Sequence, residues 1–170
     1  MDLFTAIKSR RSIRKFKNTS IEQEKLNRIL EAGRLAPSAR NLQNWKFIVV
    51  KNREIKEKLM EAAKGQKMVA EAPIVIVACG TQTEYIMSCG QPSYTINVSI
   101  AVVHMMLKAT EEGLGTCWLG AFYEEPVKKI LGIPKEIRVV AMFPLGYPDI
   151  EPKQPSRKKL EEIVCYEKWE

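Results

Sequence analysis

The chain is poor in the residues from which metal sites and redox-active thiol sites are built. It has a single histidine, His104, and four cysteines that never occur as a C-x-x-C pair. A zinc site or a thioredoxin-like motif needs several such residues at short spacings, so both are excluded. We therefore interpret the cysteines as reduced thiols. Two disulfides in a secreted protein are the alternative, although no other feature of the chain indicates export.

Long apolar runs and low-complexity tracts are also missing. No apolar stretch approaches the length that crosses a bilayer, and the start of the chain carries Asp2 where a signal peptide has basic residues. Hydrophobic residues make up 45% of the chain and charged residues 28%, which is ordinary for a globular protein. We expect a cytoplasmic protein with one domain over residues 1–170 and no membrane partner.

The net charge of +7 raises the question of a nucleic-acid partner. It arises from 27 Lys and Arg residues against 20 Asp and Glu residues, and only the segments around Arg10 and Arg157 are locally basic. Nucleic-acid modules usually combine such charge with exposed aromatic residues or a reading helix, and this sequence has neither pattern. A nucleic-acid module therefore ranks well below a protein that binds a small molecule.

Hydrophobic periodicity predicts helices that alternate with strands. Asp2 is expected to cap the first helix, and the spacing Ser20-x-x-Gln23 predicts a capping box at the second. The pattern gives helices at residues 2–9, 20–33, 54–64, 94–109 and 124–131, and strands at residues 45–50, 74–79, 116–121 and 138–145. The class is α+β or α/β with a mixed sheet.

Two of these elements are apolar on more than one side. The strand at residues 74–79 has no polar face, so we expect it inside a sheet that helices cover on both sides. The helix at residues 94–109 has apolar side chains in nearly every direction, which predicts a central position and a contact with a second subunit. The polar connection at residues 80–93 is the best candidate for a mobile segment near a site.

Two segments near the start carry the side chains that a phosphorylated, planar ligand requires. In the arginine segment, residues 10–14, guanidinium groups flank a serine, and such groups bind phosphate oxygens through forked, charge-assisted hydrogen bonds. In the amide turn, residues 37–43, Asn and Gln side chains offer donors and acceptors together. The imide edge of the FMN ring requires hydrogen-bond donors and acceptors side by side. A solvated charge run and an ordinary turn are the alternatives.

Four segments, taken in order, resemble the nitroreductase family of FMN-dependent oxidoreductases. They are RRSIRKF, APSARNLQNWKF, GLGTCWLGAF and LGYP with its basic PSRKKLEEIV tail, and the resemblance covers nearly the whole chain. It implies an α+β fold with a mixed, mostly antiparallel sheet flanked by helices. It also implies an intertwined homodimer that binds FMN at each end of the subunit interface, with both chains contributing.

Carried over position by position, the resemblance implies two groups of cofactor-binding residues. One group holds the phosphate and the ribityl chain, with help from the basic tail, and consists of Arg10, Arg11, Ser12, Arg14, Arg157 and Lys158. For Arg14 a purely structural role is the alternative. The other group surrounds the ring and ribityl chain and consists of Pro37, Ser38, Ala39, Asn41, Gln43 and the backbone of Leu119, Gly120 and Ala121.

The resemblance also implies the chemistry. NADH or NADPH delivers hydride to the flavin, and an electron-poor acceptor such as a nitroaromatic, a quinone or a flavin then takes two electrons in a ping-pong cycle. No catalytic side chain is required, because the cofactor reacts at its N5 atom. A protein that binds FMN or another phosphorylated ligand without turnover is the alternative. Asn44 departs from the family, which commonly has proline at this position.

Overall fold

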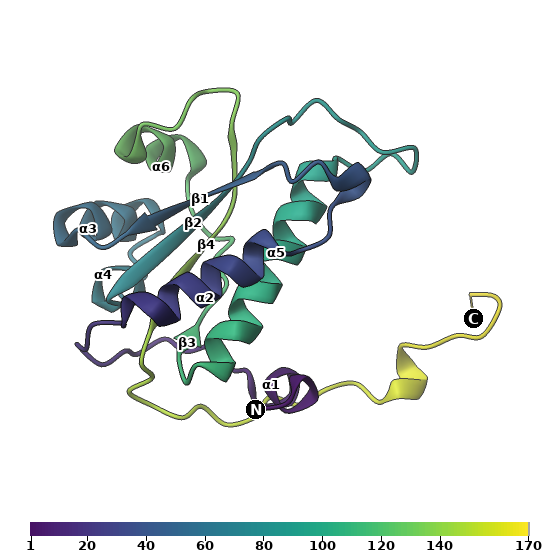
Figure 1. The fold of residues 1–170 in the computed structure, drawn as a ribbon, viewed down its shortest axis with the longest axis horizontal. Coiled ribbons are helices and arrows are strands. Elements are labelled where there is room, and N and C mark those ends of the chain that lie inside the picture. Colours follow the sequence, from purple (N-terminus) through teal and green to yellow (C-terminus); the bar gives the residue numbers. More distant parts are fainter. Residues whose placement is uncertain (170) are drawn as a thin grey trace.

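The four strands of the fold form one sheet in the order β1-β2-β4-β3 (Figure 1). The computed structural model describes residues 1–169. The strands are β1 (Trp45–Val50), β2 (Ile74–Gly80), β3 (Gly115–Thr116) and β4 (Arg138–Gly146). Their three pairings are antiparallel, and an isolated bridge joins Ser12 to Thr116 in parallel. The predicted α+β fold with a mixed, mostly antiparallel sheet is confirmed.

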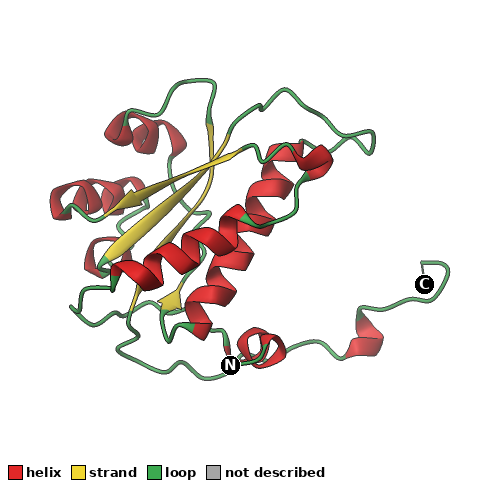
Figure 2. Ribbon diagram, in the orientation of Figure 1, coloured by secondary structure: helices red, strands yellow, loops and turns green. Residues whose placement is uncertain are grey.

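Helices cover both faces of this sheet (Figure 2). All seven residues of β2 are buried, and their side chains alternate between two separate cores. One core lies under α2 (Gln23–Arg34) and α5 (Ser93–Glu111), and the other lies under α3 (Arg53–Ala62), α4 (Met68–Glu71) and α6 (Glu124–Leu131). This two-sided burial explains why β2 has no polar face, as predicted.

The two ends of the chain lie outside these layers. Helix α1 (Leu3–Ser9) begins at Asp2, whose Oδ1 accepts a hydrogen bond from the Thr5 N–H at 3.0 Å, so the expected cap is confirmed. After β4 the chain passes α1 and runs away from the body through the short helix η2 (Leu160–Glu162) (Figure 1). The tail exposes 72% of Leu160 and 96% of Trp169. It therefore adds nothing to either core.

The capping box predicted at Ser20 is wrong. Helix α2 begins at Gln23 with Glu22 as its N-cap residue, and no side chain makes the cap hydrogen bond. The Glu22 carboxylate instead accepts a hydrogen bond from the Tyr147 hydroxyl at 2.6 Å. This tertiary bond fixes the start of the helix two residues later than the local motif predicts.

Other elements also differ from the prediction. Helix α3 begins at Arg53, because the Asn52 side chain accepts a hydrogen bond from the Ile55 N–H at 3.0 Å. Helix α4 was not predicted, since four residues are too few to show a helical period. The strand expected at residues 116–121 shortens to β3, after which only Leu119 pairs again with β4, at Met142.

Helix α5 is the longest element, and its burial is one-sided in a single chain. Its 19 residues span about 28 Å. Val98, Val102 and Met105 are fully buried, whereas Ile96 and Val103 remain 38% and 45% exposed. The all-round burial predicted from the sequence is therefore not achieved within one chain. None of the helices formed by residues 1–169 combines the length and apolar character that crossing a bilayer requires, and the cytoplasmic location stays a prediction.

An ion cluster joins α2 to the end of α5. The Glu112 carboxylate accepts two hydrogen bonds at 2.8 Å from the Arg28 guanidinium, and the Lys108 ammonium lies 2.9 Å from it. These cations hold the pKa of Glu112 at about 2, below its ordinary value of 4.5. The unfolded chain therefore binds more protons than the folded chain between these two values, so the stabilisation by the cluster is complete above about pH 4.5 and is lost as the pH falls toward about 2.

We predict that Glu112→Gln lowers the free energy of unfolding by about 1–2 kcal/mol at pH 7, since part of the cluster is exposed and screened. The difference from the wild type should shrink as the pH falls from about 4.5 to about 2, because Glu112 then becomes protonated in the folded as well as in the unfolded protein. Urea unfolding at several pH values measures it. A difference that stays constant down to pH 2 would contradict the cluster's role.

Candidate functional site

The arginine segment leaves α1 and runs along the outer edge of β3. The Ile13 N–H donates to the Thr116 carbonyl at 2.9 Å, and Ser12 lies opposite Thr116 in the parallel bridge. Gly115 permits this close approach, because a Cβ atom there would lie 2.5 Å from the Ile13 side chain. Residues 10–14 are thus fixed in an extended conformation at this edge of the sheet.

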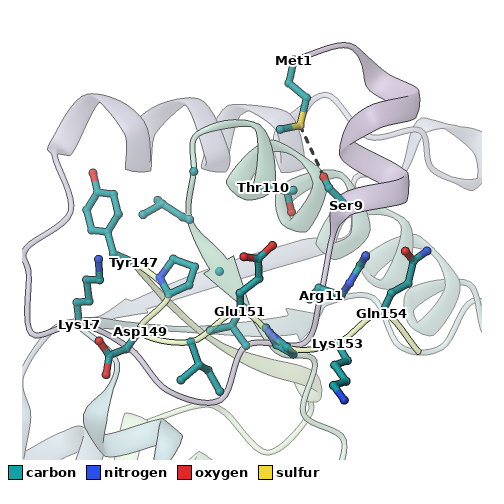
Figure 3. Close-up of a pocket in the computed structure, with 17 residues that line it drawn as sticks. Met1, Ser9, Arg11, Lys17, Thr110, Tyr147, Asp149, Glu151, Lys153 and Gln154 are labelled. Carbon is teal, nitrogen blue, oxygen red and sulfur yellow. Dashed lines mark hydrogen bonds between the residues drawn. The ribbon is translucent and has the colours of Figure 1, made fainter. Parts of the chain in front are cut away.

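Successive side chains of an extended segment point to opposite sides, and this divides the predicted phosphate group. Arg11 lines a cleft of about 860 Å³ together with Ser9 and Ile13. Figure 3 shows Arg11 and Lys153 on one side of this cleft, and Tyr147, Lys17 and Asp149 on the other. Arg10, Ser12 and Arg14 do not line the cleft. They lie on the opposite side of the segment from Arg11.

Hydrogen bonding separates these residues in the same way. The Arg11 guanidinium donates to the carbonyls of Lys8 and Arg10, at 2.7 and 3.0 Å, and so satisfies the end of α1. The guanidinium groups of Arg10 and Arg14 make no hydrogen bond or ion pair with any residue in the range 1–169. One nitrogen of Arg11 therefore stabilises the end of α1, while Arg10 and Arg14 keep their whole guanidinium groups available for a ligand.

A buried hydroxyl lies beside this pair of cations. Thr116 is 1% exposed, and its Oγ1 atom has no hydrogen-bond partner within the described chain. A buried polar atom normally has a partner, and Thr116 lies directly opposite Ser12 in the bridge. The edge of β3 thus combines two unpaired cations with two hydroxyls, which is a donor set suited to an anion such as a phosphate group.

Residues 119–121 continue along the same edge. Leu119 exchanges two hydrogen bonds with Met142, at 2.8 and 3.2 Å, and the Ala121 carbonyl accepts one from the Gln66 side chain at 3.1 Å. Gly120 is exposed, and a Cβ atom added there would meet only the Trp118 ring nitrogen, at 3.9 Å. Leu119 is therefore buried and paired, whereas Gly120 and Ala121 leave exposed backbone at this edge.

The amide turn has an unusual backbone. Arg40, Asn41 and Gln43 have φ angles of +51°, +54° and +46°, in the left-handed region that side chains disfavour. Ser38 closes the turn, because its carbonyl accepts the Asn41 N–H at 2.9 Å and its hydroxyl accepts the Gln43 N–H at 3.0 Å. The side chains of Asn41 and Gln43 are exposed as a result. Pro37 at the start of the turn is exposed too.

The amide turn and the arginine segment lie at opposite ends of the chain's body. The Ala39 N–H donates to Asn97, in the first turns of α5, whereas Ser12 pairs with Thr116, just beyond the end of α5. The strands next to them, β1 and β3, are also the two outer strands of the sheet (Figure 1). The length of α5, about 28 Å, exceeds that of an FMN molecule. One chain therefore does not bring the two predicted groups together.

The two tail residues remain apart from both groups. Arg157 and Lys158 are exposed, and the Arg157 guanidinium donates only to the neighbouring Ser156 carbonyl, at 3.3 Å. No hydrogen bond within residues 1–169 joins them to the arginine segment. In a single chain the tail thus contributes nothing to the edge of β3.

Other reactive groups have structural explanations. Burial raises the pKa of the Cys79 thiol to about 11, so this cysteine is not a nucleophile at neutral pH. His104 lies half-buried near the middle of α5 and lines an apolar groove. Sequence reasoning missed Asn97, although an amide on the buried side of an otherwise apolar helix is a signal that could have found it.

Comparison with known proteins identifies the same family from the sequence and from the fold. The sequence matches the nitroreductase family over residues 7–67 and 61–147. A protein of Methanothermobacter thermautotrophicus, whose name places it among NADH dehydrogenases or NAD(P)H nitroreductases, is 37% identical over 158 residues, covering 89% of this chain and 80% of that protein.

Solved structures extend the agreement to three dimensions. A nitroreductase family protein from Clostridium novyi NT superposes with a TM-score of 0.85 at 38% identity, covering 91% of this chain and 89% of that one. An FMN-dependent nitroreductase from Clostridium difficile R20291 gives a TM-score of 0.87 at 29% identity, covering 98% and 99%. On the evidence of its sequence and its fold, the chain belongs to the nitroreductase family.

Proposed function

We propose that the protein is an FMN-dependent oxidoreductase, a single FMN-binding domain over residues 1–170 that passes two electrons from NADH or NADPH to an electron-poor acceptor. Acceptors of this class are nitroaromatics, quinones and flavins. The observation that carries the proposal is the edge of β3, where the guanidinium groups of Arg10 and Arg14, on either side of Ser12, have no partner within residues 1–169. The names of the related proteins, which include an FMN-dependent nitroreductase, support the cofactor.

The residues at this edge fit FMN in a definite order. Arg10 and Arg14 neutralise the phosphate, and the Ser12 hydroxyl donates to it or to the ribityl chain. The open backbone at Gly120 lies against the ring, where no side chain prevents close approach. When bound, FMN supplies the N5 atom that accepts and returns hydride. The protein's own residues bind and orient the ring.

The ring edge requires the amide turn of a second chain. Asn41 and Gln43 carry the amides that suit the imide edge of the ring, but they lie at the far end of α5 from Arg10. A two-fold dimer with antiparallel α5 helices places the end of one helix beside the start of the other. Each of its two sites then combines the arginine segment of one chain with the amide turn of its partner.

An apolar surface on this side of the molecule supports the dimer. A groove of about 460 Å³ runs between α1, the end of α2 and α5, and its lining includes Leu3, Ile7, Leu35 and Leu107. Leu3, Ile7 and Leu35 are more than half exposed in the single chain. A second copy covers this surface, and the extended tail brings Arg157 or Lys158 to the phosphate.

The same arrangement supports a ping-pong cycle. The nicotinamide donor and the acceptor use one open face of the ring in turn, since the exposed Gly120 and Ala121 leave room beside it. The one histidine of the chain, His104, lines the apolar groove and does not belong to this edge. We propose that the cycle needs no side chain for proton transfer. Catalysis then depends on positioning and on the charge of Arg10 and Arg14.

The proposal is tested by the colour of the purified protein. We expect a yellow protein whose visible absorbance bleaches when NADH or NADPH is added without oxygen, and returns when a nitroaromatic or a quinone is added. A protein that stays colourless after incubation with excess FMN would contradict the cofactor assignment. Bound FMN that no nicotinamide donor reduces would identify a binding protein without turnover.

The two neighbouring arginines should respond differently to substitution. We predict that Arg10→Ala weakens FMN binding by about tenfold to a hundredfold, since a charge-assisted bond to phosphate is lost. Arg11→Ala should change FMN binding by less than about threefold but lower the stability by about 1 kcal/mol, because two hydrogen bonds at the end of α1 disappear. Titration of FMN fluorescence and urea unfolding measure the two effects. The reverse order would disprove the assignment.

The dimer is tested at an exposed position of α5. We predict that Val103→Glu, which places a charge on the 45% exposed Val103, yields a folded monomer of half the wild-type mass in sedimentation. Tyr123→Glu is the matched control, because Tyr123 is 58% exposed beside α6, on the other face of the sheet. A Val103→Glu protein that keeps the dimeric mass would rule out this interface.

A further inference from the structure

A chain of buried amides lies directly beneath the amide turn. Asn44 and Asn97 are each 1% exposed, and Ser93 is fully buried. The Asn97 amide donates to the Asn44 side-chain oxygen at 2.7 Å, and the Asn44 amide donates to the Ser93 hydroxyl at 3.2 Å. We call these three residues the amide network. Three buried polar side chains in a small domain are retained only where each finds partners.

The network ends on the backbone of the amide turn. The side-chain oxygen of Asn97 accepts a hydrogen bond from the Ala39 N–H at 3.0 Å. The Asn44 carbonyl accepts the Thr81 N–H at 3.0 Å, just after β2. The turn is thus tied at one end to α5 and at the other to the sheet.

The same network reaches the connection at residues 81–92. The Ser93 N–H donates to the Tyr85 carbonyl at 3.0 Å, and the Arg40 guanidinium lies 5.1 Å from the centre of the Tyr85 ring. Arg40 belongs to the amide turn, so the turn and the connection are linked twice. The connection expected to be mobile is therefore held at Tyr85.

The backbone of the turn requires such support. Arg40, Asn41 and Gln43 all have positive φ angles, and each non-glycine residue in this region costs free energy relative to an ordinary conformation. Such conformations persist only where the surrounding structure fixes them. The hydrogen bonds of Ser38 act within the turn, so the amide network is the one set of side chains that anchors the turn to α5 among residues 1–169.

We propose that Asn97 and Asn44 are positioning residues for the flavin ring: through the buried amide network they hold the turn that presents Asn41 and Gln43 to the ring edge. This inference rests on the proposed function. Asn97 and Asn44 are buried and do not touch the cofactor themselves. They fix the strained backbone, and the affinity and reactivity of bound FMN depend on that backbone.

The test compares Asn97→Ala with Val98→Ala in the full-length protein. Val98 is the next residue on α5, is fully buried in the apolar core and has no side-chain group that could join the hydrogen-bonded network, so Val98→Ala is a matched control for lost stability. We expect Asn97→Ala to weaken FMN binding about tenfold or more and to shift the reduction potential of bound FMN. Val98→Ala should lose comparable thermal stability yet keep FMN affinity within about threefold.

Hydrogen exchange of the protein without FMN supplies an independent readout. Asn97→Ala should speed exchange of the Ala39 amide and of residues 40–43, whereas Val98→Ala should leave these amides unchanged. Asn44→Ala is the milder variant, because the bond between Asn97 and Ala39 survives. Its effect on FMN affinity should be smaller, and the double variant should bind FMN no more weakly than Asn97→Ala alone.

The outcomes separate this inference from the proposed function. If the wild type binds no FMN, both fail together. If the wild type binds FMN but Asn97→Ala and Val98→Ala weaken it equally, or if Asn97→Ala leaves both the affinity and the exchange of the turn unchanged, only the positioning role is overturned. Asn97→Ala and Asn44→Ala effects that simply add would likewise contradict a connected network.

Discussion

The length of helix α5 is the constraint on which the rest of this structure depends. Its 19 residues carry the amide turn at one end and lead into β3, with the arginine segment beside it, at the other. A rigid helix of about 28 Å keeps these two groups too far apart for one FMN molecule. The same helix presents an uncovered apolar face at Ile96 and Val103. In the dimer that we propose, pairing two such helices in opposite directions would cover this face and bring the two groups together.

The short strand β3 holds the arginine segment in place because it is paired on both sides. Strand β3 has only two residues, yet it pairs with β4 on one side and with the arginine segment on the other. Gly115 lets Ile13 approach, and the extended backbone then sends Arg10, Ser12 and Arg14 to one side and Arg11 to the other. The charge of the segment is thus divided between two tasks: Arg11 completes α1, and its neighbours remain available for a phosphate.

Much of the fold follows from local sequence, and what does not follow is tertiary. The apolar strand at residues 74–79 and the cap at Asp2 were predictable, because burial on two faces and capping depend on nearby residues. The capping box predicted at Ser20 was wrong, because the start of α2 depends on the hydrogen bond between Glu22 and Tyr147, which are 125 positions apart in the sequence. For the site, composition identified the arginine segment and the amide turn but not their separation. Periodicity also cannot distinguish Val102, which is buried, from Val103, which is 45% exposed in the single chain.

The central claim, that each site is shared between two chains, is tested most directly with mixed dimers. One chain carries Arg10→Ala and the other carries Asn41→Ala with Gln43→Ala, and the FMN bound per mixed dimer is measured at equilibrium. If the sites are shared, both defects fall in one site and the second site is intact, so each mixed dimer binds one FMN with wild-type affinity, while neither parent dimer does. If each chain forms its own site, both sites are damaged and no FMN binds tightly, which would contradict the account.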